Sequence, residues 1–169
     1  MVTSGVAACL CYLAATGLQL KKILKGNGTD VWVKPLAAVA IILHGFTAYK
    51  GFVNISGYDL GIYPMLSLMS LSISAIVLIS SLRRPVDNLL VFVFPIAIST
   101  IILQIALKGD YTPRQDITGG IFTHIALSII AYSLLTIAAA QALLLSFGDK
   151  MLRHHQLAIL RNLPPLETM

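Results

Sequence analysis

Two histidines stand inside two of the long apolar stretches of this 169-residue sequence. His44 lies at the centre of one stretch, and His124 lies near the start of another. An ionisable side chain in hydrocarbon costs free energy, and chains that keep one there commonly use it. A neutral imidazole can ligate a metal ion or a haem iron. The two histidines are therefore the first candidates for chemistry in this chain.

Each histidine also has a structural explanation. His44 can be a buried, uncharged histidine that is hydrogen-bonded to a serine or a carbonyl of a neighbouring helix. His124 follows Gly119 and Gly120 and can be an interfacial histidine at a helix start. Two histidines from two helices can also hold one haem between them, although their depths in the membrane differ by several ångströms.

Other candidate residues carry less chemistry. His154 and His155 are adjacent in the tail, and neighbours on a helix do not face the same way, so a solvated face explains them. Lys108 and Arg114 lie on the connection before the fifth apolar stretch, where they can meet haem propionates or be ordinary loop charges. The sequence has no Cys-x-x-Cys, glycine-rich phosphate loop or acidic residue inside an apolar stretch. We therefore expect no enzyme and no transporter that uses a membrane carboxylate.

The composition predicts a membrane protein. Hydrophobic residues make up 57% of the chain and charged residues 11%, whereas soluble domains have about a quarter charged residues. A membrane helix needs about 20 mostly apolar residues. We predict an all-α polytopic membrane helix bundle, a single membrane domain over residues 1–169, with five spans and an amphipathic tail helix on the cytoplasmic side. The predicted spans are 2–20, 35–53, 62–82, 88–107 and 120–147, and the tail helix covers 149–163.

The basic residues predict how the bundle is oriented. Cytoplasmic connections of membrane proteins carry an excess of Lys and Arg. If the first connection, the third connection and the tail are cytoplasmic, nine of the twelve Lys and Arg residues are inside and only Lys50, Lys108 and Arg114 are outside. The N-terminus is then outside, and the first stretch, which no basic residue precedes, is a retained span. The net charge of +5 thus reflects topology, and we expect no nucleic-acid partner.

Small and polar residues recur at helical spacing in four of the spans. Such stripes mark the faces by which membrane helices pack closely and hydrogen-bond to one another. We therefore expect both histidines on packing faces. The stripes are Gly5, Ala8, Tyr12 and Ala15; Ala37, Ala40, His44, Thr47, Ala48 and Gly51; Ser67, Ser70 and Ser74; and His124, Ser128, Tyr132 and Thr136. The remaining span contains Pro95, which is expected to bend its helix.

The fifth span also carries a family pattern, His-Ile-x-Leu-Ser-x-x-x-Tyr, from His124 to Tyr132. With this pattern the chain resembles the cytochrome c assembly membrane protein family, and more closely its HemX-like and YpjD-like inner-membrane branch. The other matching pieces are Leu43-His44, the serine-rich run Leu66 to Ser72, Pro95, the run Ala138 to Leu143 and the tail from Leu163 to Glu167.

The resemblance implies a function in cytochrome c biogenesis at the inner membrane. It implies that His44 and His124 bind the iron of haem b as axial ligands, among lipid and other cytochrome c maturation proteins. Haem-presenting members have a tryptophan-rich outer motif, and residues 108–119 contain no tryptophan. Members of this branch have further spans, so we expect this chain to be the N-terminal part of a longer protein. The alternatives are a scaffold or regulator that does not bind haem, acting on haem synthesis or on another membrane complex, and a transporter subunit.

Overall fold

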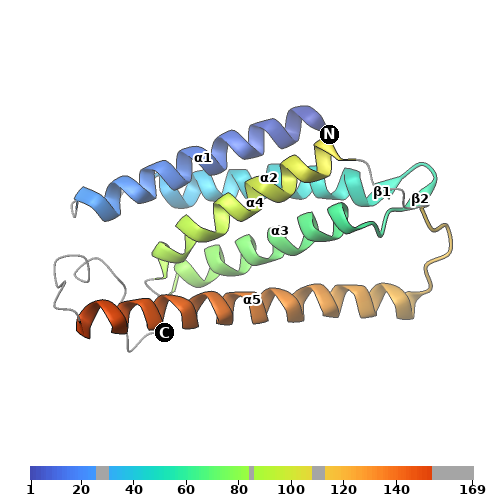
Figure 1. Ribbon diagram of the computed structural model, residues 1–169. Coiled ribbons are helices and arrows are strands. Elements are labelled where there is room, and N and C mark those ends of the chain that lie inside the picture. Colours follow the sequence, from blue (N-terminus) through green and yellow to red (C-terminus); the bar gives the residue numbers. More distant parts are fainter. Residues whose placement is uncertain (26–30, 84–85, 108–112, 154–169) are drawn as a thin grey trace.

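The computed structural model describes residues 1–25, 31–83, 86–107 and 113–153, and these residues form the predicted all-α bundle. Each of the five predicted spans corresponds to a helix that is long and apolar enough to cross a membrane (Figure 1). Helices are required there because lipid offers no hydrogen-bond partner to the backbone. The helices are α1 (Val2–Lys25), α2 (Val33–Phe52), α3 (Ile62–Ser81), α4 (Leu90–Ala106, after the 3-10 turn η1, Asp87–Leu89) and α5 (Gly119–Arg153).

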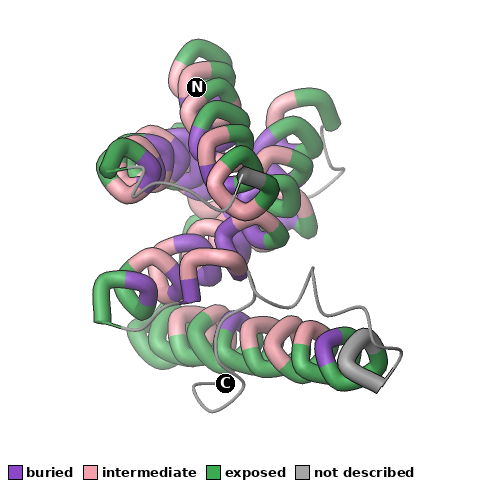
Figure 2. The backbone as a smooth tube through the Cα atoms, turned by 90° about the vertical axis from the view of Figure 1, so that its left-hand side faces the viewer, coloured by how far each residue is buried: buried purple, intermediate pink, exposed green. Residues whose placement is uncertain are grey.

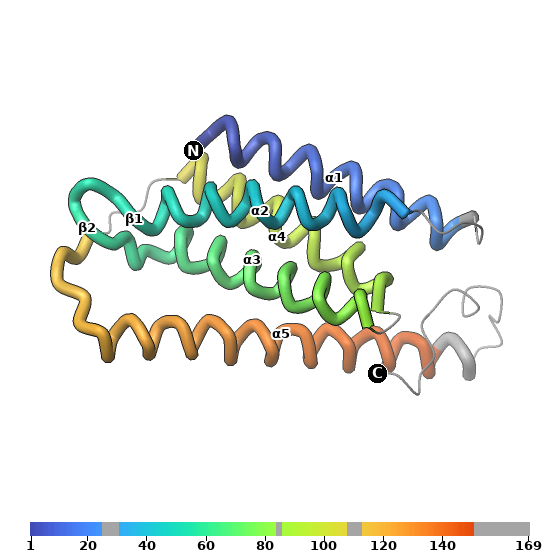
Figure 3. The backbone as a smooth tube through the Cα atoms, turned by 180° about the vertical axis from the view of Figure 1, so that it is seen from behind, coloured from blue at the N-terminus to red at the C-terminus, as the bar shows by residue number. Residues whose placement is uncertain are grey.

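Successive helices run in opposite directions, and four of them form one packed unit. Helix α1 packs against α2 and α4, and α3 packs against α2 and α4. Helix α5 packs mainly against α3 and extends along one side of the bundle, as the view from behind shows (Figure 3). Pro95 lies inside α4, which continues through it to Ala106. The predicted tail helix lies outside the described residues beyond Arg153.

The predicted packing stripes are correct for the first three helices. Tyr12, His44 and Ser67 and the other stripe members of α1, α2 and α3 are buried where the helices meet. Gly5 lets α1 approach its neighbours closely, because a β-carbon there would collide with Ile105. The buried residues gather between the helices in the end-on view (Figure 2).

The stripe predicted for α5 is wrong. His124 and Tyr132 are exposed, whereas Ser133 is fully buried against α3. A helix has 3.6 residues per turn, so positions spaced strictly by four drift about 40° around the helix at each step. Within this chain, no other helix covers most of the surface of α5 (Figure 2).

A small hairpin joins α2 to α3. Strands β1 (Val53–Asn54) and β2 (Gly57–Tyr58) pair antiparallel, and Gly57 has a φ of 126°, which favours glycine. Tyr58 also exchanges two backbone hydrogen bonds with Arg114, of 2.9 and 3.0 Å. We call residues 53–58 with Arg114 the clasp, because they tie the α2–α3 connection to the α4–α5 connection.

Candidate functional site

His44 lies at the centre of a polar cluster that joins three helices. Its Nδ1 atom is 3.3 Å from the hydroxyl oxygen of Tyr12 on α1, and its Nε2 atom is 3.1 Å from Oγ of Ser67 on α3. All three side chains are fully buried. We call Tyr12, His44 and Ser67 the His44 cluster.

Aromatic and hydroxyl contacts enclose the His44 cluster. The Tyr12 ring meets the His44 ring edge-on, with centroids 5.8 Å apart, and lies 5.0 Å from the ring of Phe94 on α4. A second hydroxyl pair, Ser70 on α3 and Thr100 on α4, is 2.6 Å apart. Four helices thus contribute to one polar layer inside the bundle.

The hydrogen bonds limit what His44 can do. A neutral imidazole has one donor and one acceptor nitrogen, and a hydroxyl can serve either, so both nitrogens are satisfied whichever tautomer is present. A metal ion or haem iron needs a ring nitrogen with a free lone pair, so one of the two bonds must open before His44 can act as a ligand. Among the residues described, no three His, Cys, Asp or Glu side chains gather closely enough to hold a metal ion.

His124 lies in a different environment. It is exposed near the start of α5, beside residues that line an apolar groove of about 450 Å³. The groove lies between the ends of α2 and β2, the start of α5 and Leu68 of α3. Its lining residues are Tyr49, Phe52, Val53, Tyr58, Leu68, Phe122, Ile125, Ala126 and Ile129. The clasp bonds the exposed Arg114 to the groove-lining Tyr58, which brings a cation to this part of the surface.

The structure does not bring the two predicted ligands together. His44 is enclosed by Tyr12 and Ser67, whereas His124 is exposed on α5, a helix that packs mainly against α3. On α5, His124 is about 200° around the helix from both Phe122 and Ala126, so it faces away from the middle of the groove. Lys108, His154 and His155, the other predicted candidates, lie outside the described residues.

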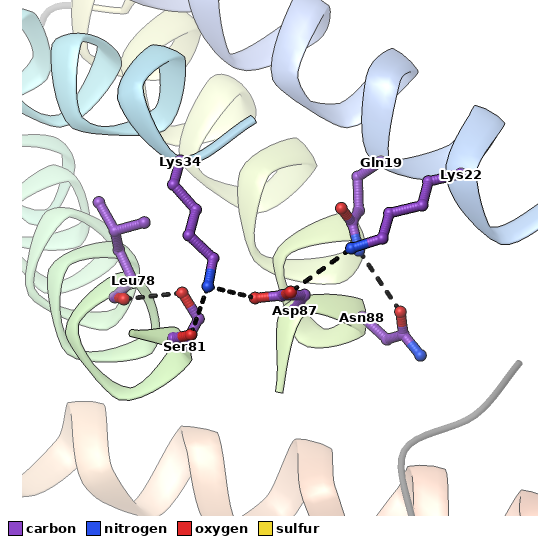
Figure 4. A network of polar contacts seen from close by, with 7 residues as sticks. All are labelled: Gln19, Lys22, Lys34, Leu78, Ser81, Asp87 and Asn88. Carbon is purple, nitrogen blue, oxygen red and sulfur yellow. Dashed lines mark hydrogen bonds and ion pairs between the residues drawn. The ribbon is translucent and has the colours of Figure 1, made fainter. Parts of the chain in front are cut away.

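A second polar network lies at the end of the bundle opposite the clasp (Figure 4). The Asp87 carboxylate lies 3.6 Å from Nζ of Lys22 and 3.4 Å from Nζ of Lys34. Lys34 also donates a 2.6 Å hydrogen bond to the carbonyl of Ser81. The sequence explains these lysines by topology alone, and nothing in it indicates that Lys22 and Lys34 converge on Asp87.

The alternative of a buried His44 that is hydrogen-bonded to a serine of a neighbouring helix is confirmed by Ser67, but the sequence indicates neither which serine it is nor the second partner, Tyr12. Tyr12 and Ser67 each lie on a predicted stripe, but a stripe fixes only the face of a helix. Which residues meet across two helices depends on the depth of each helix in the membrane, and no local sequence pattern gives that depth.

Fold and site together define a polytopic membrane protein built from α-helices. The chain is similar to the proteins named inner membrane protein YpjD in three strains of Escherichia coli. The chain is 28% identical to each of them over an alignment of 169 positions, which covers 98% of this chain and 64% of the relative. The chain thus spans a little under two thirds of the length of these relatives. No family model matches the chain, and no solved structure matches it.

Proposed function

We propose that this chain is a multi-pass inner-membrane protein that binds or handles haem b during cytochrome c biogenesis. Similarity to inner membrane protein YpjD supports the location. The resemblance of the fifth span to cytochrome c assembly proteins supports the pathway. Haem is cargo in this proposal, and the chain itself catalyses no reaction.

The apolar groove beside the start of α5 carries the proposal. Its lining of aromatic and aliphatic side chains suits the body of a porphyrin, because pockets for such ligands are mostly apolar with a few polar groups. Arg114 supplies a cation for a propionate. His124 faces away from the middle of the groove, so only its exposed position and the resemblance of the fifth span support it as an iron ligand. His44 fits haem only after its bond to Tyr12 or Ser67 opens, so the two histidines act at different positions or at different times.

Absorption spectra test the proposal. The chain is purified in mild detergent, with and without added haemin, and spectra are recorded before and after reduction with dithionite. We expect a Soret band with sharp reduced α and β bands, and a loss of intensity in His124→Ala. His154→Ala, in the tail, is the matched control and keeps the spectrum. Spectra of a well-folded chain with added haemin that equal those of haemin in the same detergent without protein refute haem handling by this chain.

The hydrogen bonds of His44 favour a second function, that of a membrane scaffold or regulator without haem. Both ring nitrogens are satisfied by hydroxyls, as expected for a histidine that joins helices. If this is its role, His44→Ala lowers the stability of the bundle and leaves haem spectra as they are. If His44 is a ligand, His44→Ala changes the haem absorption spectrum under conditions in which the variant stays folded.

The positions of the Lys and Arg residues support an orientation with the N-terminus outside. Lys22 and Lys34 lie at the end of the bundle that also holds Asp87, and nine of the twelve basic residues belong to the connections and tail on that side. A single cysteine at Ile55, in a background without Cys9 and Cys11, is then labelled by a membrane-impermeant thiol reagent in intact cells. A cysteine at Val31 is labelled only after the cells are opened. The reverse pattern refutes this orientation.

A further inference from the structure

Two lysines converge on one carboxylate at the end of the bundle opposite the clasp. Lys22 lies in the last turn of α1, Lys34 lies in the first turn of α2, and Asp87 begins the turn η1 before α4. The Asp87 carboxylate lies between the two ammonium groups (Figure 4). We call these three residues the Asp87 cluster, in which segments far apart in the sequence bring their charges to one place.

The Asp87 cluster carries an excess of positive charge. Two ammonium groups share one carboxylate, so the net charge of the cluster is +1. The 3.6 Å separation between Lys22 and Asp87 is longer than a hydrogen bond. The side chains of Lys22 and Lys34 remain 35% and 39% exposed. An anion can therefore reach both lysines from outside the bundle.

The surroundings of the Asp87 cluster place it where a lipid headgroup lies. Trp32, two residues before Lys34, is 72% exposed, and tryptophan is enriched at the boundary between membrane and water. Lys34 donates a hydrogen bond to the carbonyl of Ser81, and the exposed Leu82 and Ile79 lie beside Ser81 at the end of α3. An anion bound at Lys34 thus has an exposed apolar surface next to it.

We propose that the Asp87 cluster binds the phosphodiester group of an anionic phospholipid, whose acyl chains lie along Leu82 and Ile79. Ammonium groups form charge-assisted hydrogen bonds with phosphate oxygens, and basic pockets between membrane helices bind anionic headgroups. Asp87 holds Lys22 and Lys34 near each other and neutralises only one of their two charges. A zwitterionic lipid has no net charge to offset the remaining one. The proposal depends neither on haem nor on the orientation of the chain.

The fluorescence of Trp32, the only tryptophan of the chain, tests the proposal. The 169-residue chain is reconstituted in phosphatidylcholine vesicles that contain a rising fraction of brominated lipid, either phosphatidylglycerol or phosphatidylcholine. Bromine near the headgroup end of the acyl chains quenches a nearby tryptophan, so the ratio of the two quenching curves measures the preference for the anionic lipid. We expect a preference on the order of tenfold, which Lys22→Gln or Lys34→Gln each lowers about fivefold.

Lys21→Gln is the matched control, because Lys21 is exposed in the neighbouring position of α1 and its loss changes the net charge equally. We expect this variant to keep the preference of the unmodified chain. A general attraction of anionic lipid to the basic end of the chain treats the two positions alike. An equal loss in Lys21→Gln and Lys22→Gln therefore refutes the proposal, and so does an unmodified chain without any preference.

Inorganic phosphate distinguishes a lipid from a free anion as the ligand. It is added to vesicles that contain brominated phosphatidylglycerol, against sodium chloride of the same ionic strength. We expect the two salts to leave the same quenching. Recovery of Trp32 fluorescence with phosphate alone identifies a free phosphate ion as the ligand and overturns the assignment to lipid. Circular dichroism shows whether each variant is folded, and the preference of the unmodified chain and the phosphate comparison need no variant.

Discussion

Replacing Tyr12 by phenylalanine removes one hydroxyl from the His44 cluster and keeps the aromatic ring. The ring contacts with His44 and Phe94 are retained, so the change removes only the contacts of the hydroxyl, which are its bond to Nδ1 of His44 and its interaction with Ser74. That bond is 3.3 Å long, slightly longer than the usual range of about 2.7–3.2 Å and therefore weak. Hydrogen bonds between membrane helices are worth about 0.6 kcal/mol on average and up to about 1.7 kcal/mol. Leaving a buried group without a partner costs about 1–3 kcal/mol in soluble proteins.

We therefore expect Tyr12→Phe to lower the free energy of unfolding by about 0.5–1.5 kcal/mol. The assay is the loss of helical circular dichroism as the fraction of dodecyl sulfate in mixed micelles is raised. Tyr132→Phe is the matched control, because Tyr132 is 60% exposed on α5 and its loss of a hydroxyl should have no effect. Equal stability of the Tyr12→Phe variant and the unmodified chain refutes the reasoning, and so does an equal loss in both variants.

The same variant separates the two candidate functions. Without the Tyr12 hydroxyl, Nδ1 of His44 has no partner from α1 and its lone pair becomes available in one tautomer. If His44 ligates iron, we expect Tyr12→Phe to bind added haemin more tightly than the unmodified chain. If His44 only joins the helices, haemin titrations of the two proteins coincide while their stabilities differ.

Four further substitutions test other parts of the structure. We expect Gly51→Ala to lower stability by about 1 kcal/mol through its collision with Gln104, a loss that Gln104→Ala relieves in the double variant. Gly17→Ala, where a β-carbon meets nothing within 4 Å, instead gains about 0.5–1 kcal/mol by helix propensity. Asp87→Asn, which removes the partner of two lysines, costs about 0.5–1 kcal/mol and less at high salt in the same titration. Gly57→Ala, at a φ of 126°, costs about 1–3 kcal/mol locally and speeds amide hydrogen exchange in the clasp.

The fold could be predicted because lipid leaves the backbone little choice. Each apolar stretch of membrane length must be helical, so five stretches predicted five helices. The ends were less accurate, since α1 continues to Lys25 and the predicted span stops at residue 20. Polar residues can extend a membrane helix beyond the hydrocarbon, and hydropathy does not report that extension.

The candidate site could be predicted only in part. A polar residue among small residues indicates a packing face. This argument correctly predicts that Tyr12, His44 and Ser67 are buried. The same argument failed for His124, because α5 has one helix partner over most of its length and spacing by four does not follow one face. No sequence pattern predicts the clasp, because two-residue strands lack a recognisable alternation of polar and apolar residues and Arg114 is far from Tyr58 in the sequence.

The length of α5 makes bilayer thickness a variable that acts on this helix more than on the others. Its apolar part, residues 120–147, is about 42 Å long at 1.5 Å per residue, against about 30 Å of hydrocarbon. Tilting or local thickening of the bilayer must absorb the excess of about 12 Å. Because α5 is attached mainly to α3 and at the clasp, this mismatch acts on the seam between α3 and α5. Lipids with longer acyl chains reduce the mismatch, and thinner membranes increase it, so membrane composition can set the angle of α5 and with it the shape of the apolar groove.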